Sequence, residues 1–185
     1  MPQQSPSQTV GPFFHYSLFH GGDSILVNDL TSGQRILVTG QVIDGDGTPM
    51  PDAMLEIWQA DTNGYFNHEN DPNQGKADPH FRGFGRADTM NNGRYTFKTV
   101  KPGIVSGHVT PFINVRIFAR GMLIHAITRL YFGDESGNEQ DEVLNSVDPD
   151  RRHTLIAEPQ QTGDLPTYCF NIHMQGEGET VFFNP

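Results

Sequence analysis

The feature that most limits the folds open to this chain is a series of short segments in which apolar and polar residues alternate before a turn. Arg94–Val100 alternates in this way, and Lys101-Pro102-Gly103 ends the segment. A period of two predicts a strand with one buried face. Comparable apolar segments occupy 36–43, 53–59, 112–119, 122–132, 168–174 and 180–183. About seven or eight strands, each with one face to bury, predict an all-β fold, a β-sandwich with long loops.

The connections between these segments also carry information. With 20 Gly and 13 Pro, the chain has the residues that many tight turns need. The turn at 44–49 predicts a hairpin between the first two strands. Residues 61–92 are rich in Asp, Asn, Gly and Pro and predict a long connection, which in a compact domain usually has a task. A short helix is expected at 141–147, and a final hairpin at 168–174 and 180–183.

Two parts of the chain differ in pattern. Residues 1–33 show no period of 2 or 3.6 and contain the aromatic cluster Phe13, Phe14, Tyr16 and Phe19. A solvated tail is poor in aromatic residues, so we expect an irregular N-terminal arm that packs on a partner chain. Residues 34–185 are expected to form one sandwich domain, because 185 residues sustain a single core.

Charge and cysteine content exclude several classes of protein. The net charge is −10 and the pI is about 5.1. No run of Lys and Arg could neutralise phosphates, so neither nucleic acid nor an anionic membrane surface is an expected partner. The single cysteine excludes an internal disulfide, and no signal-peptide pattern or membrane-length apolar run is found. A cytoplasmic protein is expected.

Neither the acidic turns nor the eight histidines form a local metal-binding motif. The turns Asp44-Gly45-Asp46-Gly47 and Asp61-Thr62-Asn63-Gly64 lack the remaining oxygen ligands of a calcium loop, and turn chemistry explains both. The histidines never stand two apart on a strand or three to four apart on a helix, which are the spacings that place two imidazoles on one face. Ligands brought together from distant segments stay open.

Several motifs in order along the chain resemble one enzyme family. The first begins at Gly40 and ends in Leu55-Glu56-Ile57-Trp58-Gln59-Ala60. The others are Gly83-Phe84-Gly85-Arg86, Gly93-Arg94-Tyr95-x-Phe97-x-Thr99-Val100-Lys101-Pro102-Gly103 and Thr128-Arg129-Leu130-Tyr131-Phe132. Together they are similar to the intradiol ring-cleavage dioxygenases, over a stretch that runs from residue 34 to the C-terminus.

This resemblance implies an iron site on another chain. In that family a β chain binds non-haem Fe(III) through two Tyr and two His, and it pairs with an α chain of similar fold that lacks the metal. Tyrosinate oxygens suit Fe(III), which draws the catecholate substrate into coordination. At the four ligand positions this sequence has Phe66, Val105, Asn114 and Arg116. Arginine stays protonated and repels a metal, so the resemblance implies an α-type chain that holds no metal.

Two residues near these positions carry further expectations. Tyr65 stands next to Phe66, but a one-residue shift along a strand-like segment points its side chain to the other face. We expect Arg116 to fill part of the vacated iron cavity and to lie beside a carboxylate, because an unpaired charge in a core costs several kcal/mol.

Three further segments resemble the α chains of the family specifically. They are Ser7–Phe13, Phe118–Gly121 and Gly176–Phe183. The resemblance implies an αβ oligomer that acts on protocatechuate and O2. It also implies that the partner's substrate pocket is completed by Thr9, Gly11, Pro12, Phe13 and Arg120 of this chain.

Two alternatives stay open at the level of sequence. One is a self-sufficient intradiol dioxygenase with an altered metal site, which the iron content of the isolated chain would reveal. The other is a binding or scaffolding module that keeps the sandwich and has lost catalysis. Copurification with an iron-containing homologous chain separates this module from the α-chain interpretation.

Overall fold

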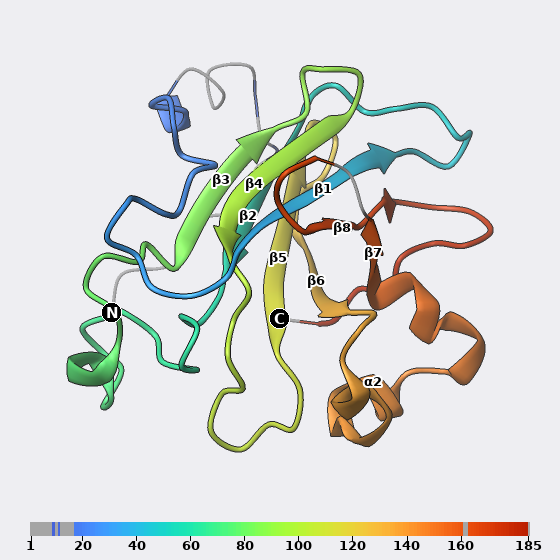
Figure 1. The fold of residues 1–185 in the computed structure, drawn as a ribbon. Coiled ribbons are helices and arrows are strands. Elements are labelled where there is room, and N and C mark those ends of the chain that lie inside the picture. The colour runs from blue at the N-terminus through green and yellow to red at the C-terminus, as the bar shows by residue number, and fades with distance from the viewer. Residues whose placement is uncertain (1–8, 10, 12–16, 161–162, 185) are drawn as a thin grey trace, which may run out of the picture.

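The computed structural model describes residues 9, 11, 17–160 and 163–184, which form a nine-stranded β-sandwich (Figure 1). The strands are β1 (Arg35–Ile43), β2 (Ala53–Trp58), β3 (Phe84–Asp88), β4 (Arg94–Val100), β5 (Phe112–Ala119), β6 (Ala126–Phe132), β7 (Ile156–Gln160), β8 (Thr167–Cys169) and β9 (Ile172–His173). The predicted fold class is confirmed. The number of strands is larger than expected because β3 and β7 were not predicted and the segment at 168–174 divides into β8 and β9, whereas the strand predicted at 180–183 does not form.

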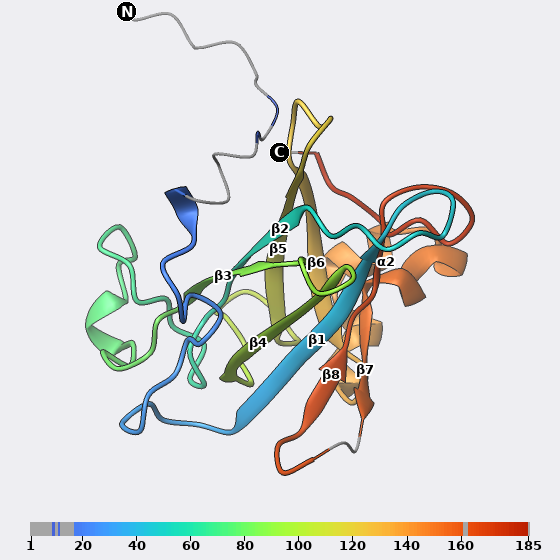
Figure 2. The same ribbon diagram turned by 90° about the horizontal axis from the view of Figure 1, so that it is seen from above.

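The strands form two layers that are joined at one corner. Their order is β3-β2-β5-β6-β7-β8-β1-β4, and β9 pairs with β1. Strand β7 makes the corner, since its first residues pair with β6 and its last residues pair with β8. Figure 2 shows the layer of β1, β4 and β8 facing the layer of β2, β5 and β6. The two layers enclose the core.

Alternation along the strands fills this core as the sequence predicts. In β5, Ile113, Val115 and Ile117 are buried, whereas Asn114 and Arg116 between them face outward. Strand β1 follows the same pattern through its whole length. Each fully buried aliphatic or aromatic side chain contributes about 1.5–3 kcal/mol relative to an exposed one. The outward-facing residues of β2 and β5 are therefore free to line a site.

The predicted hairpin between the first two strands is wrong. The turn itself forms, since Oδ1 of Asp44 accepts hydrogen bonds from the backbone N–H groups of Asp46 and Thr48. However, β1 pairs with β4, β8 and β9, whereas β2 pairs with β3 and β5. Pro49 and Pro51 have no N–H to donate to a ladder, so the chain leaves one layer here and enters the other.

Three other segments also differ from expectation. The long connection at 61–92 contains β3, which pairs with β2. Residues 180–183 form no strand: Thr180 donates its N–H to the carbonyl of His173, and Phe183 makes an isolated bridge to Ile127. The strand expected to begin at Met122 begins at Ala126. Short apolar runs therefore predicted where strands lie more accurately than they predicted the residues at which the strands begin and end.

Helical structure is sparse, and the part of it between β6 and β7 in the sequence lies beside these two strands (Figure 1). The predicted helix is confirmed as α2 (Glu142–Ser146), and the carboxylate of Asp141 caps it by accepting the N–H of Leu144. Short 3-10 segments occupy Gln74–Lys76, Ser136–Gln140 and Pro149–Leu155. Among the described residues, the helices are too short or too polar to cross a membrane.

Part of the segment that precedes β1 packs on this chain's own sandwich. Leu26 is 2% exposed and lies in the main core. Backbone hydrogen bonds join Leu26 and Ser24 to Lys98 of β4, and join Asp23 to Arg86 of β3. These contacts fix the segment along β3 and β4, the two end strands of the order.

Candidate functional site

A cavity of about 680 Å³ lies against the face of β2 and β5 that is turned away from the core. Trp58 and Glu56 of β2 stand opposite Asn114 and Arg116 of β5 in the ladder. Because alternate residues share a face, these four side chains point to the same side of the sheet. The complete lining is Glu56, Ile57, Trp58, His68, Phe84, Asn114, Arg116 and Ile127.

Two of the four positions that the resemblance predicts to correspond to iron ligands thus line the cavity. Asn114 is half-buried and Arg116 is exposed. Phe66 lies close by, because its ring stacks on Trp58 with centroids 5.7 Å apart and planes 10° apart. Val105 packs instead against the small apolar cluster around Phe112.

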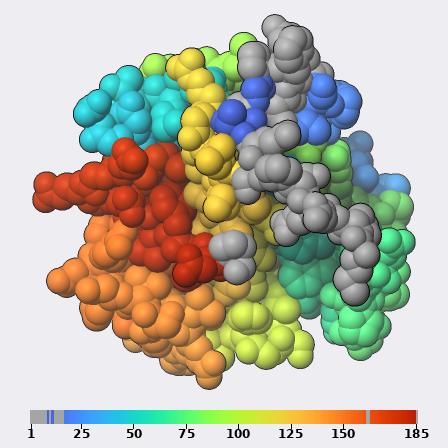
Figure 3. Space-filling model, turned by 180° about the vertical axis from the view of Figure 1, so that it is seen from behind, coloured from blue at the N-terminus to red at the C-terminus, as the bar shows by residue number. Residues whose placement is uncertain are grey.

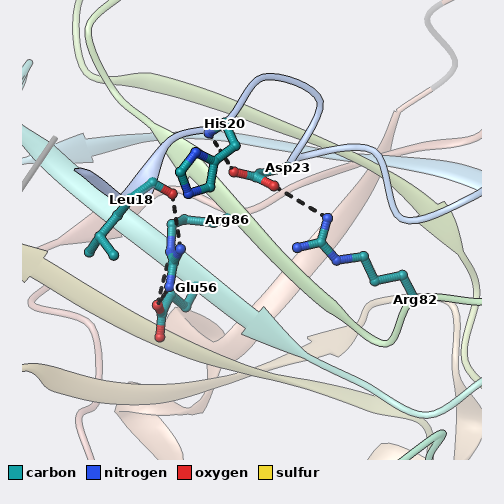
Figure 4. A network of polar contacts seen from close by, with 6 residues as sticks. All are labelled: Leu18, His20, Asp23, Glu56, Arg82 and Arg86. Carbon is teal, nitrogen blue, oxygen red and sulfur yellow. Dashed lines mark hydrogen bonds and ion pairs between the residues drawn. The ribbon is translucent and has the colours of Figure 1, made fainter. Parts of the chain in front are cut away.

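A row of three charged residues crosses strands β3, β2 and β5. Glu56 is paired in register with Arg86 on one side and with Arg116 on the other. Arg86 forms an ion pair with Glu56: its Nε and Nη2 atoms donate hydrogen bonds to Oε1 of Glu56 at 3.0 and 2.6 Å. Arg86 also donates to the carbonyl of Leu18, as Figure 4 shows. Glu56 therefore forms an ion pair with Arg86 and not with Arg116.

The expectation that Arg116 is buried beside a carboxylate is wrong. Its side chain is exposed, and in the part of the chain that the structure describes it makes neither an ion pair nor a hydrogen bond. The physical reason is competition, since the neighbouring carboxylate, Glu56, is held by Arg86. Arg116 does line the cavity, but its side chain is exposed and water solvates its charge.

Asn114 is fixed from the side of β6. Its Oδ1 accepts a hydrogen bond from Nε of Arg129 at 3.3 Å. The guanidinium of Arg129 lies 3.9 Å from the centroid of the Phe112 ring and also reaches Tyr131. With its carbonyl oxygen engaged, Asn114 has its amide N–H groups left to donate.

The tyrosine next to Phe66 does not restore a phenol to the cavity. Tyr65 is outside the lining set, and Nζ of Lys76 lies 5.6 Å from the centroid of its ring. The loop that carries both residues is fixed by the buried carboxylate of Asp61, which accepts N–H groups of Asn63, Tyr65 and Asp78. The prediction that Asp61 is a turn former is thereby confirmed.

The residues around the cavity do not fit a ferric ion. Its walls offer an amide, a guanidinium, aromatic rings and one imidazole, that of His68, and its single carboxylate belongs to the ion pair with Arg86. In the described segments, no three His, Cys, Asp or Glu side chains stand close enough together to hold a metal ion. Ferric iron requires several anionic oxygen or imidazole ligands, and one imidazole beside a carboxylate that is held by arginine does not supply them.

The residues expected to reach a partner chain lie elsewhere, at the β5–β6 turn. Arg120 is 83% exposed and pairs with the carboxylate of Asp52. The N–H of Gly121 donates to Oγ1 of Thr9 at 2.8 Å, so this part of the arm lies beside the turn (Figure 3). Gly11 is exposed. Pro12 and Phe13 lie outside the described residues.

Sequence reasoning overlooked several residues of the cavity. Trp58 and Phe84 supply its aromatic walls, and Glu56 and Arg86 set its charge. The alternation in Leu55-Glu56-Ile57-Trp58 was the available signal, because it places Glu56 and Trp58 on the outer face. No local signal in the sequence indicated which arginine pairs with Glu56, because this choice depends on the register of three strands.

Comparison with known proteins agrees with this geometry. A family model described as "Dioxygenase" matches residues 10–176. The protocatechuate 3,4-dioxygenase alpha chain of Burkholderia cepacia is 43% identical over 195 residues, which cover 98% of each chain. The beta chain of the same organism is 30% identical over 158 residues, covering 80% of this chain and 67% of its own length. An intradiol ring-cleavage dioxygenase from Tetranychus urticae superposes with a TM-score of 0.64 and 25% identity, covering 81% of this chain and 84% of its own.

Proposed function

The chain belongs to the intradiol ring-cleavage dioxygenase family and is of the alpha-chain type, and from this premise we propose that it completes the substrate pocket of an iron-bearing β chain. The family depends on non-haem iron. The observation that carries the proposal is the pair Asn114 and Arg116, which faces the cavity where a metal-binding chain has two histidines. The assembly would cleave protocatechuate with O2 between the two hydroxyl-bearing carbons.

Three residues at one end of the sandwich support a role at the partner's pocket. Arg120 follows directly after β5 and is exposed, and Thr9 holds the arm beside it through Gly121. Protocatechuate carries a carboxylate that is ionised at neutral pH, and a buried site must offer it a compensating charge or good donors. Arg120 is the cation placed to supply that charge, while the arm, with Gly11, Pro12 and Phe13, packs on the partner chain.

The ion pair of Arg120 leaves it available for a ligand. Its partner Asp52 is 34% exposed, and exposed pairs contribute at most about 1 kcal/mol. A charge-assisted hydrogen bond to a substrate carboxylate is worth about 1.5–3 kcal/mol. The substrate carboxylate is therefore able to displace Asp52.

The experiment compares two substrates in the reconstituted αβ complex. Arg120→Ala should lower kcat/KM for protocatechuate by about 10- to 100-fold, which corresponds to the loss of one charge-assisted hydrogen bond. Catechol, which lacks the carboxylate, should lose much less. Arg94→Ala is the matched control, since Arg94 is an exposed arginine on β4 without an ion pair in the described residues. Equal losses for both substrates, or no loss for protocatechuate, would remove Arg120 from the pocket.

Metal analysis separates this proposal from its alternatives. The chain purified alone should contain no stoichiometric iron and no visible tyrosinate-to-iron absorption, whereas the complex should contain one iron per β chain. A coloured, iron-replete isolated chain would indicate a self-sufficient enzyme. A chain that never copurifies with an iron-containing homologue would indicate a scaffolding module.

A further inference from the structure

The cavity beside β2 and β5 has features of its own that the proposed function does not use. Its volume of about 680 Å³ falls within the range of small-molecule sites, roughly 300–1,000 Å³. Trp58 and Phe84 give it flat aromatic walls, and Ile127 adds aliphatic surface. Such walls favour a flat, apolar ring.

The electrostatics of the cavity favour an anion. Glu56 is the single acidic residue of the lining, and Arg86 neutralises it at 2.6 Å. Arg116 adds a positive charge that no carboxylate in the described residues balances. A chain with a net charge of −10 thus presents an unneutralised arginine on the wall of an aromatic cavity.

The donors of the cavity also suit a carboxylate. The guanidinium of Arg116 offers N–H groups in the planar fork that binds a carboxylate through two parallel hydrogen bonds. Asn114 stands two residues away on the same face, and its carbonyl oxygen is engaged by Arg129. The amide N–H groups of Asn114 are therefore placed to donate to an oxygen substituent of the ring.

From these contacts we propose that the cavity is a metal-free binding site for a small aromatic carboxylate. The carboxylate binds Arg116, and the ring lies against Trp58 and Phe84. This site goes beyond the proposed function, because it needs neither iron nor a partner chain.

The sequence provides a built-in probe for the test. Trp58 is the single tryptophan of the chain and lines the cavity, so tryptophan fluorescence reports on this site. The full-length chain, treated with a chelator, is titrated with benzoate and separately with benzamide, which has the same shape and no charge. We expect saturable quenching by benzoate and a Kd for benzamide that is about 10- to 100-fold weaker, as loss of a charge-assisted hydrogen bond predicts.

Two matched variants locate the interaction. Arg116→Gln should weaken benzoate binding by about 10- to 100-fold and leave benzamide binding unchanged, since it removes the charge and little else. Arg94→Gln makes the same substitution at an exposed arginine of β4 that is absent from the cavity lining, and it should bind benzoate as the wild type does. Urea unfolding confirms that both variants are folded.

Isothermal titration calorimetry of the same samples provides the second measurement. The proposal is overturned if neither method detects saturable benzoate binding, if benzamide binds equally well, or if Arg94→Gln weakens binding as much as Arg116→Gln. Because ring cleavage is measured only in the reconstituted complex, failure of this site and failure of the proposed function give different results.

Discussion

Replacing Asp61 by alanine should cost this protein a large share of its stability. The side chain is 1% exposed and its carboxylate accepts three backbone hydrogen bonds, from Asn63 at 2.8 Å, Tyr65 at 3.0 Å and Asp78 at 2.8 Å. These bonds close the loop that places Phe66 and His68 against Trp58. Alanine leaves all three N–H groups without their acceptor.

The magnitude follows from the number of bonds and from the relaxation of the loop. A hydrogen bond to a charged group contributes about 1.5–3 kcal/mol, so three of them set an upper limit of roughly 5–9 kcal/mol. Asn63 is exposed, and water can replace part of the loss there. We therefore expect Asp61→Ala to lower the free energy of unfolding by about 3–5 kcal/mol, and Tm by about 2–4 °C for each kcal/mol. Asp61→Asn keeps Oδ1 and should lose about 2 kcal/mol.

Urea unfolding of the full-length chain, followed by circular dichroism, measures these losses from the midpoint at constant m-value. Asp44→Ala is the matched control, because Asp44 also accepts two turn N–H groups, at 2.9 and 2.8 Å, but in an exposed turn. Its loss should be about 0.5–1.5 kcal/mol. If Asp61→Ala proves no more destabilising than Asp44→Ala, the buried carboxylate does not hold the loop and this reasoning fails.

Three other predictions concern packing, pH and the exposed ion pair. Gly40→Ala should destabilise by about 3 kcal/mol, because its Cβ would lie 1.9 Å from the carbonyl oxygen of Phe170, whereas Gly75→Ala, with nothing within 4 Å, should stay within about 0.5 kcal/mol in the same urea assay. A hydrogen bond from the N–H of His20, supported by Arg82 (Figure 4), holds the pKa of Asp23 below its usual 3.8. The stability that Asp23 contributes is therefore present above pH 3.8 and is lost as pH falls through the lower folded-state pKa. The difference in unfolding free energy between wild type and Asp23→Asn should shrink below pH 3.8, and a difference independent of pH would contradict this. Asp52→Asn should release Arg120 and raise kcat/KM of the αβ complex on protocatechuate by up to about 5-fold, with no change on catechol; a decrease would show that Asp52 positions Arg120 for the substrate.

Much of the fold could be predicted from the sequence, because strand formation is a local property. Alternation in Arg94–Val100 and in the segment after Phe112 gave the buried faces of β4 and β5 correctly. The capped helix after Asp141 was found for the same reason. The absence of tyrosine and histidine at the ligand positions is likewise a matter of residue identity, which is read directly from the sequence.

The tertiary structure alone decided which strands pair and which charges meet. The turn at 44–49 is compatible with a hairpin, yet β1 and β2 enter different layers, because strand pairing minimises the exposure of all apolar faces together. Glu56 is adjacent to both Arg86 and Arg116 only after β3, β2 and β5 align, and it binds Arg86. Local patterns determine the elements and the chemistry that each residue offers. The register between distant strands determines which of those residues are neutralised and which, like Arg116, are left free to bind.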